Sequence, residues 1–325
     1  MADLIGTSLR RLRDQLHGRL SMPGDALYAA TMAIWAKPMG RKPRAVAHCE
    51  TPGDIQLAIR SARDCDVPLS VRGGGHDWVG RALCDGIVID LSDMNTVVVD
   101  SDNRVARIQG GARASHVVAA ADSFGLAPVT GSVGAVGMTG LTLGGGYGPL
   151  IGRFGLALDN LLAAEVVLAD GRFVVADPDN ERELFWALRG GGGNFGVVTA
   201  MRYRLHNLPS VSSGMLIYPF AEAKAVLEGC ADILASAPEE LTAQLGLVVG
   251  PDGTPVVMIV PTWCGPPQAG EAPLARLFKL GTLLANTVAV IPYGASLTVF
   301  ESVPRQWAPD IHGDVLASRT RQEKC

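Results

Sequence analysis

Clusters of glycine are the feature of this sequence best suited to chemistry. Of its 325 residues, 39 are glycine, and 24 of these fall between residues 71 and 196. Four runs stand out: Arg72-Gly-Gly-Gly-His76, Gly131-Ser-Val-Gly-Ala-Val-Gly137, Gly144-Gly-Gly-Tyr-Gly148 and Gly190-Gly-Gly-Gly-Asn-Phe-Gly196. Glycine is needed where the backbone takes a positive φ or closely approaches a ligand, and successive backbone N–H groups in such turns form anion-binding concavities. The clusters therefore predict a backbone cradle for a large anionic cofactor.

The last cluster matches a dinucleotide-binding fingerprint in residue types and spacing but not in the predicted elements around it. Gly191, Gly193 and Gly196 have the G-x-G-x-x-G spacing, but in a Rossmann fold that motif follows a strand and opens a helix. Here Asn180-Glu-Arg-Glu183 resembles a capping box that starts a helix before the glycines, and an alternating β-branched strand over 197–205 follows them. The phosphate-loop pattern G-x-x-x-x-G-K-[ST] is absent from the sequence. A nicotinamide-dependent dehydrogenase is therefore a distant third interpretation.

Short helices and strands must position the first three clusters. Thr51-Pro-Gly-Asp54 has the composition of a helix start, and the apolar residues after it follow the helical i, i+3, i+4, i+7 pattern. The other elements are predicted from alternation and turn residues. They are strands over 67–71 and 87–91, a hairpin of 96–99 with 105–108, a helix over 115–124 ending at Gly125, and a hairpin of 162–168 with 172–175 around Asp170-Gly171.

The pattern changes after Pro209. The predicted elements are a strand over 215–220, a helix with Val226, Cys230 and Ile233 on one face, strands over 241–249 and 256–260, and a helix over 272–280. This succession predicts an antiparallel sheet backed by helices, in an α+β arrangement. We expect one domain over residues 1–208, with its core over 38–208, and a second over 209–325.

Composition excludes several classes of protein. The chain has 28 basic and 32 acidic residues, a net charge of −4 and 48% hydrophobic residues, so it can bury real cores and lacks the basic stripe of a nucleic-acid groove. The first twenty residues hold four arginines and no apolar segment typical of a secretory signal. The longest apolar stretch, 282–300, contains Asn286 and Pro292, which disfavours a membrane span. Six cysteines without a C-x-x-C pair fit neither a zinc site nor a disulfide scaffold. We expect a cytoplasmic protein without a structural metal.

The stretch from about residue 44 to 205 resembles the FAD-binding domain of the p-cresol methylhydroxylase (PCMH)/vanillyl-alcohol oxidase superfamily. The matching segments, in the family's order, are Val71–Gly80, Ile89–Ser92, Val136–Gly148, Phe154–Asn160, Ala169–Gly171 and Phe185–Val198. Within the superfamily the chain is most similar to the berberine-bridge-enzyme-type oxidases and the bacterial 6-hydroxy-D-nicotine oxidase branch. The resemblance implies an α+β fold: a PCMH-type FAD-binding domain of two α/β subdomains, followed by an incomplete antiparallel-sheet substrate domain with helices on one face.

The resemblance also implies FAD as the cofactor, held by the glycine clusters. The implied binding residues are Arg72, Gly73, Gly74, Gly75, His76, Asp77, Gly80, Gly131, Ser132, Val136, Gly137, Thr139, Gly140, Gly144, Gly145, Gly148, Gly196 and Val198. Arg72 either adds a cation beside the pyrophosphate or forms a structural salt bridge. Asp159-Asn160 either contacts the cofactor or turns the chain, and the turn is favoured. His48, His116 and His206 lack ligand spacing and are interpreted as structural.

His76 occupies the position of the histidine that carries an 8α-N-histidyl bond to the flavin in this family. A hydrogen-bonded loop histidine is the alternative interpretation. Many relatives attach the flavin a second time, through a cysteine in a Gly-x-Cys-Pro-Thr-Val-Gly stretch, and Val133 stands at that position here. The resemblance therefore implies single attachment, through His76.

In the family, a hydride passes from an alcohol or amine to FAD, and O2 reoxidises the cofactor to give H2O2. We expect this reaction here on a small-molecule substrate, in a protein that could form a homodimer. The catalytic base stays unassigned. Tyr147, Tyr218, Trp263 and Tyr293 could face a substrate, although packing is the favoured interpretation of each.

The end of the sequence departs from the family. A Tyr-x-Gly-x-Asn-type stretch before a terminal helix is not recognisable, and residues 318–325 form a polar tail. We therefore expect a chain truncated at its C-terminus. The second interpretation of its function is a catalytically inactive flavin-binding remnant.

Overall fold

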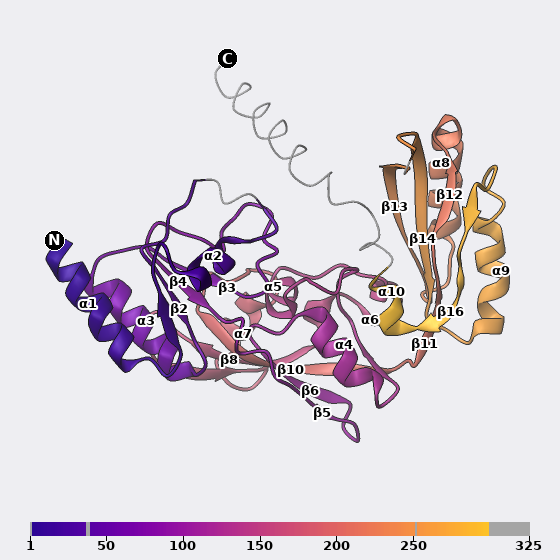
Figure 1. Ribbon diagram of the computed structural model, residues 1–325. Coiled ribbons are helices and arrows are strands. Elements are labelled where there is room, and N and C mark those ends of the chain that lie inside the picture. The colour runs from indigo at the N-terminus through magenta and orange to yellow at the C-terminus, as the bar shows by residue number, and fades with distance from the viewer. Residues whose placement is uncertain (1, 37–39, 251, 299–325) are drawn as a thin grey trace, which may run out of the picture.

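The computed structural model describes residues 2–36, 40–250 and 252–298. Three sheets follow one another along the chain, and Figure 1 shows them side by side across the molecule. Two are formed by strands up to residue 207, and the third by strands between residues 210 and 292. The predicted C-terminal tail lies outside the described residues.

The first sheet has four strands in the order β1-β2-β4-β3. Its elements are α1 (Ala2–Gln15), β1 (Arg19–Ser21), α2 (Ala26–Met32), β2 (Ala45–His48), α3 (Pro52–Asp64), β3 (Leu69–Arg72) and β4 (Ile87–Asp90). The two pairings among β2, β4 and β3 are parallel, and β1 pairs with β2 in the antiparallel sense. Helices α1 and α3 bury one face of the sheet, and α2 packs on the other. Two neighbouring strands therefore deliver their carboxyl ends, Asp90 and Arg72, to the same edge.

Helix α3 begins where its sequence predicts. The Asp54 N–H donates to Thr51 Oγ1 at 3.2 Å and the Thr51 N–H donates to Asp54 Oδ2 at 2.9 Å, which completes a capping box. The apolar face of the helix, including Ile55 and Ile59, is buried against the first sheet. The predicted helix start and its buried face are confirmed.

The second sheet is antiparallel, with the path β5-β6-β10-β8-β9 and β7 paired to β10. Its elements are β5 (Val97–Asp100), β6 (Val105–Gln109), α4 (Ala114–Asp122), β7 (Leu126–Pro128), α5 (Met138–Leu143), α6 (Ile151–Phe154), the 3-10 helix η1 (Ala157–Asn160), β8 (Leu161–Val167), β9 (Phe173–Ala176), α7 (Arg182–Leu188) and β10 (Val197–Asn207). Both predicted hairpins form. Helices α4, α5 and α7 pack on one face of this sheet.

The third sheet is antiparallel. Its central strand β14 pairs with β13 along one side and with β11 and β12 along the other side. Its elements are β11 (Ser210–Ser213), β12 (Leu216–Pro219), the 3-10 helix η2 (Phe220–Glu222), α8 (Ala223–Ala235), β13 (Leu241–Val249), β14 (Pro255–Trp263), α9 (Pro267–Leu277), β15 (Ala285–Asn286), β16 (Ala289–Pro292) and α10 (Tyr293–Ser296). Helices α8 and α9 cover one face (Figure 1). This is the predicted α+β sheet backed by helices.

Two local predictions are wrong. Asn180 does not cap α7: its side chain donates to the Asp177 carboxylate, and the capping position is Glu181, at φ 49°. Helix α9 begins at Pro267, five residues before the predicted start, because proline suits the first turn, where its missing N–H goes unused. Among the described residues, no helix is long and apolar enough to cross a membrane.

Candidate functional site

The first two glycine clusters pack directly against each other. A Cβ on Gly137 would lie 2.5 Å from the backbone N of Gly74, and a Cβ on Gly74 would lie 2.5 Å from the Cα of Gly137. Any side chain at either position would force the two turns apart. Glycine at both positions therefore allows the end of β3 and the start of α5 to form one continuous backbone surface.

Helix α5 connects this surface to the other clusters. It begins after Gly137, and the Leu143 carbonyl in its last turn accepts hydrogen bonds from the N–H groups of Gly190 and Gly192, at 3.1 and 3.0 Å. A Cβ on Gly140 would meet no described atom within 4 Å. The exposed side of this helix therefore presents backbone without side chains, a surface on which a flat or extended ligand can lie closely.

Two buried polar atoms beside the packed turns lack hydrogen-bond partners among the described residues. They are Nε of Arg72 and Oγ1 of Thr139, in side chains that are only 8% and 6% exposed. Buried polar groups are ordinarily hydrogen-bonded, so an orphan in a folded protein calls for an explanation. A guanidinium N–H and a hydroxyl are donors that suit phosphate oxygens. These atoms and the glycine turns fit the diphosphate of FAD.

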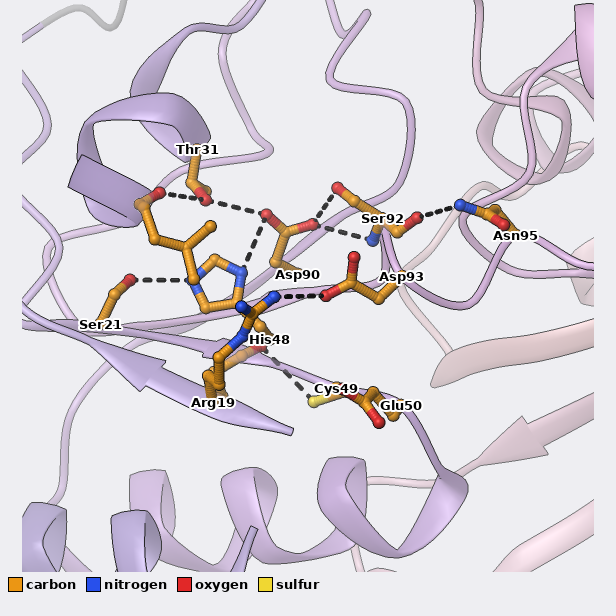
Figure 2. Close-up of polar contacts among 12 residues, drawn as sticks. Arg19, Ser21, Thr31, His48, Cys49, Glu50, Asp90, Ser92, Asp93 and Asn95 are labelled. Atoms are coloured by element: carbon orange, nitrogen blue, oxygen red, sulfur yellow. Dashed lines mark hydrogen bonds and ion pairs between the residues drawn. The ribbon is translucent and has the colours of Figure 1, made fainter. Parts of the chain in front are cut away.

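A buried polar row fixes Arg72. The Arg72 Nη1 donates to both oxygens of Asp90, at 3.2 and 3.1 Å. Asp90 also accepts from Thr31 of α2 at 2.9 Å, a bond that Figure 2 shows. His48 lies 3.7 Å from the same carboxylate and bonds Ser21 at 2.8 Å. Burial lowers the pKa of His48, and the nearby Asp90 charge offsets this only in part. The Arg72–Asp90 ion pair therefore lies beside an imidazole that burial keeps neutral.

His76 follows the first glycine turn and lies against an aromatic ring. Its imidazole stacks on Trp35, with ring centroids 5.4 Å apart and planes inclined by 23°. The backbone N–H of Trp35 donates to the Gly75 carbonyl at 2.8 Å, so the two segments are also joined through the backbone next to the histidine. Asp77 bonds the backbone N–H and the guanidinium of Arg81. Its carboxylate therefore closes the turn that carries His76.

The third sheet approaches the second glycine cluster through β13. Gln244 Nε2 donates to the hydroxyl of Ser132, so the side chains on this face of β13 point toward the FAD-binding region. Met258 and Val260 of β14 lie opposite Gly246 and Gln244 and share that face, and each is 4% exposed. The other face carries Ile259, which packs with α8 and α9. The face toward the glycine clusters therefore combines apolar Met258 and Val260 with the polar side chains of Gln244, Thr242 and Thr262.

Comparison with known proteins finds an FAD-binding domain and homologous oxidases. Residues 43–177 match the family described as "FAD binding domain". The chain is 36% identical over 282 residues to (R)-6-hydroxynicotine oxidase of Paenarthrobacter nicotinovorans, covering 86% of this chain and 62% of that protein. The crystal structure of 6-hydroxy-D-nicotine oxidase from Arthrobacter nicotinovorans superposes with a TM-score of 0.84 at 34% identity, covering 89% of this chain and 65% of that one. The chain contains an FAD-binding domain and is homologous to 6-hydroxynicotine oxidase and the BBE-like oxidases of the PCMH/vanillyl-alcohol oxidase superfamily.

More distant members of this superfamily share the fold. BBE-like 1 of Physcomitrella patens superposes with a TM-score of 0.81 at 22% identity, covering 92% of this chain and 65% of that one. The chain spans less than two thirds of the length of each of these three relatives. The fold and the FAD-binding domain are therefore those of the superfamily.

The remaining predicted cofactor residues lie in turns and strand ends whose backbone the structure describes. Several have positive φ values, which favour glycine: Gly75 at 68°, Gly80 at 72°, Gly145 at 115° and Gly196 at 152°. Gly148 packs against the Thr130 carbonyl too closely for a side chain. The others lie nearby in the same segments: Gly73 beside Gly110, Gly131 beside Leu141, Val136 bonded to Ala114, Gly144 at the end of α5, and Val198 within β10.

Of the four aromatic residues that could face a substrate, three are buried, in agreement with the favoured packing interpretation. The hydroxyl of buried Tyr218 donates to the Leu277 carbonyl at 2.6 Å, and the indole of buried Trp263 donates to the Pro266 carbonyl at 2.9 Å. Tyr293 is also buried, and burial raises its pKa above the ordinary range. Tyr147, between two glycines of the third cluster, is 73% exposed. It is the one member of this set whose hydroxyl can reach a bound molecule.

Asp159 and Asn160 form a turn, the favoured interpretation over contact with the cofactor. Asp159 Oδ2 accepts the Leu156 N–H at 2.9 Å, and the Asn160 amide donates to the Leu156 carbonyl at 3.0 Å. Asn160 also bonds His206 at 2.7 Å, whose ring stacks on Phe154. These groups therefore hold the turn before β8, and His206 is structural, as predicted.

A cavity of about 630 Å³ lies between the first two sheets, and it includes one predicted residue, Gly196. Its walls are Ile59 and Ala62 of α3, Leu69 and Val71 of β3, and the segment around Val197. In the described part of the chain, no group of three or more His, Cys, Asp or Glu side chains is arranged to hold a metal ion.

Sequence reasoning missed three residues at this site. Asp90 lies in a recognised segment, but only the parallel pairing of β3 and β4 brings it to Arg72. Gln244 reaches Ser132 across 112 positions of sequence. Trp35 has no signal in its own neighbourhood, because its contact with His76 depends on where α2 ends.

Proposed function

We propose that this chain binds FAD across the two packed glycine turns and attaches it covalently through His76. The observation that carries the proposal is the contact of Gly74 with Gly137, flanked by buried Arg72 and Thr139, each with a donor that lacks a partner among the described residues. Backbone N–H groups, a fixed guanidinium and a hydroxyl then bind the diphosphate without a metal. The FAD-binding domain and the homology to 6-hydroxynicotine oxidase support this assignment.

The protein's part in this binding is electrostatic and steric. The Arg72 side chain is held at Nη1 by Asp90, so its other edge keeps a fixed direction toward the turn at Gly75. The side-chain-free face of α5 at Gly140 allows a flat group to approach the backbone. Bound there, FAD supplies the acceptor for a hydride and the route for two electrons to O2.

We further propose that the chain is an oxidase of a small alcohol or amine, with O2 as the electron acceptor and H2O2 as a product. One relative is named for a hydroxynicotine, a small amine. The face of the third sheet that presents Gln244, Met258 and Val260 can exclude water from an apolar substrate and hold one polar group of it. Tyr147 is the exposed hydroxyl in the glycine clusters and the candidate to hold or relay the substrate proton.

The second candidate is a flavin-binding protein without turnover. It is kept beside the oxidase because the chain spans 62% of the length of the nicotine oxidase it matches, so that enzyme's activity is a proposal for this chain. Both candidates require FAD at the glycine turns. They differ in whether a substrate can reduce it.

The attachment is tested first, by denaturing gel electrophoresis of the purified full chain under ultraviolet light. We expect flavin fluorescence to remain with the polypeptide, and a tryptic peptide containing His76 to carry the flavin mass. His76→Ala should give a dark band and release free FAD, whereas His17→Ala, an exposed histidine near the N-terminus, should stay fluorescent. Complete release of FAD from the unmodified protein would contradict covalent attachment.

Turnover is tested separately by anaerobic mixing with a panel of hydroxy- and amino-substituted compounds. Bleaching of the flavin absorbance by a panel member, followed by H2O2 release on admitting air, supports the oxidase. A covalently loaded protein that no panel compound bleaches, but dithionite does, supports the protein without turnover. A cytoplasmic location and a homodimer remain predictions.

A further inference from the structure

We propose that Trp35 is a positioning residue that orients the His76 imidazole for its attachment to the flavin. The inference rests on the attachment proposed above and adds a residue from a different part of the chain. It is carried by the stacked contact of the two rings and by the polar cluster that anchors both of their segments.

The contact between the two segments involves backbone and side chains together. The backbone N–H of Trp35 donates to the Gly75 carbonyl at 2.8 Å. The indole ring of Trp35 stacks on the His76 imidazole, with ring centroids 5.4 Å apart and planes inclined by 23°. This is the range and inclination of offset aromatic stacking. The Ile34 side chain lies under Gly75, where a Cβ would meet it at 3.4 Å. The imidazole therefore cannot change its ring plane without losing the stack.

A second aromatic ring contacts Trp35. Trp78, two residues after the histidine, lies with its ring centroid 5.1 Å from that of Trp35 and its plane tilted by 34°. The indole of Trp35 therefore contacts two rings of the same loop, those of His76 and Trp78.

One buried carboxylate holds both segments in place. Asp90 accepts from Thr31 in α2 (Figure 2), the helix that ends three residues before Trp35. It also accepts from Arg72, four residues before His76. The two rings therefore meet at the ends of short segments that share an anchor 2% exposed to solvent. This explains how a residue from the N-terminal segment can set the geometry of the first glycine loop.

The attachment step needs such a constraint. A ring nitrogen of His76 forms a C–N bond to the 8α carbon, a C–H bond of that carbon breaks, and the imidazole N–H proton passes to solvent. The two electrons released are taken up with protons by O2, giving H2O2, so that atoms and electrons balance. Because bond formation requires the nitrogen to be aimed along one line, misplacement by about 1 Å can slow such a step about 100-fold.

The experiment follows covalent attachment with time in full-length protein prepared from riboflavin-depleted cells and mixed with FAD. Acid-resistant flavin measures attachment, and quenching of FAD fluorescence measures binding. We expect Trp35→Ala to bind FAD within about threefold of the unmodified protein and to attach it about 10- to 100-fold more slowly. Trp186→Ala, a change of a 76% exposed tryptophan on α7, is the matched control and should attach at the unmodified rate.

A second pair of variants tests the inference if Trp35→Ala does not fold. Trp35→Phe keeps a ring to stack and Trp35→Leu keeps only apolar bulk, so attachment should be faster in the phenylalanine variant. Equal rates in that pair, or an unmodified rate in Trp35→Ala, would overturn the role of Trp35 while leaving attachment at His76 intact. Absence of covalent flavin in the unmodified protein would overturn the attachment and this inference together.

Discussion

The tetrapeptide Arg-Gly-Gly-Gly occurs twice in this chain, at 72–75 and at 189–192, and the two copies are held in different ways. Arg72 is 8% exposed and pairs with Asp90, which is 2% exposed. The Arg189 side chain is 36% exposed and pairs with Asp159, whose side chain is 45% exposed, at 3.2 Å. The same letters therefore produce a buried anchor in one loop and a surface ion pair in the other.

The glycines of the two loops differ in the same sense. Gly74 is required because the backbone of Gly137, 63 residues away in sequence, touches it. In the second loop, a Cβ on Gly191 would lie 2.5 Å from the Ala187 carbonyl oxygen of the helix just before it, and a Cβ on Gly193 would meet none of the described atoms within 4 Å. A run of glycines thus identifies a loop whose backbone matters, but it does not distinguish close approach from conformational freedom. The first loop is the one that packs against the Gly137 turn, and it forms part of the proposed cofactor site.

The largest effect is expected from replacing the two arginines in turn. Arg72→Met leaves the Asp90 carboxylate buried without its cation, and we expect a loss of about 3–5 kcal/mol in the free energy of unfolding. Arg189→Met removes a half-exposed pair and should cost less than about 1 kcal/mol. Urea unfolding of both variants measures the difference. Equal losses would mean that the two pairs contribute alike and that the comparison is wrong.

A smaller effect is expected from adding one methyl group to each loop. Gly74→Ala forces the two packed turns apart, and overpacking of this kind costs about 1–3 kcal/mol. Bound flavin per polypeptide should fall with it, because the turns form the proposed site. Gly193→Ala should change stability by no more than about 1 kcal/mol, since its new methyl group has room. Tm and the visible absorbance of the purified variants report both quantities, and a yellow, fully stable Gly74→Ala protein would contradict the close packing.

A third effect is expected from acid, and it concerns the neighbourhood of the second loop. Burial, reinforced by Arg204, Arg104 and Arg153, lowers the pKa of His206 from 6.5 to about 4. Between these values the unfolded chain binds more protons than the folded one, so stability should fall as pH drops from 6.5 toward 4. In His206→Gln the decline of Tm over this range should be shallower, whatever the Tm at pH 8. An unchanged slope would assign the acid sensitivity to other groups, of which buried His48, with its lowered pKa, is the first.

Local sequence predicted most of the elements because their signals lie within a few residues. The Thr51–Asp54 capping box, the two hairpins and the buried face of α8 at Val226, Cys230 and Ile233 are confirmed. The same kind of signal was wrong at Asn180, because a carboxylate three residues earlier competes for its side chain. Capping patterns are therefore informative only where no nearer partner exists.

The sequence by itself determined the glycine clusters, their order along the chain and the superfamily that this order indicates, because each depends on residue types and local spacing. It left Arg72 undecided between a cation for the cofactor and a structural ion pair. The tertiary structure shows the pair with Asp90 made at one edge of the guanidinium, while Nε at the other edge has no described partner. Only the fold brings Asp90, Trp35 and Gln244 to the glycine clusters, because parallel strand pairing, the end of α2 and the packing of the third sheet join residues far apart in sequence.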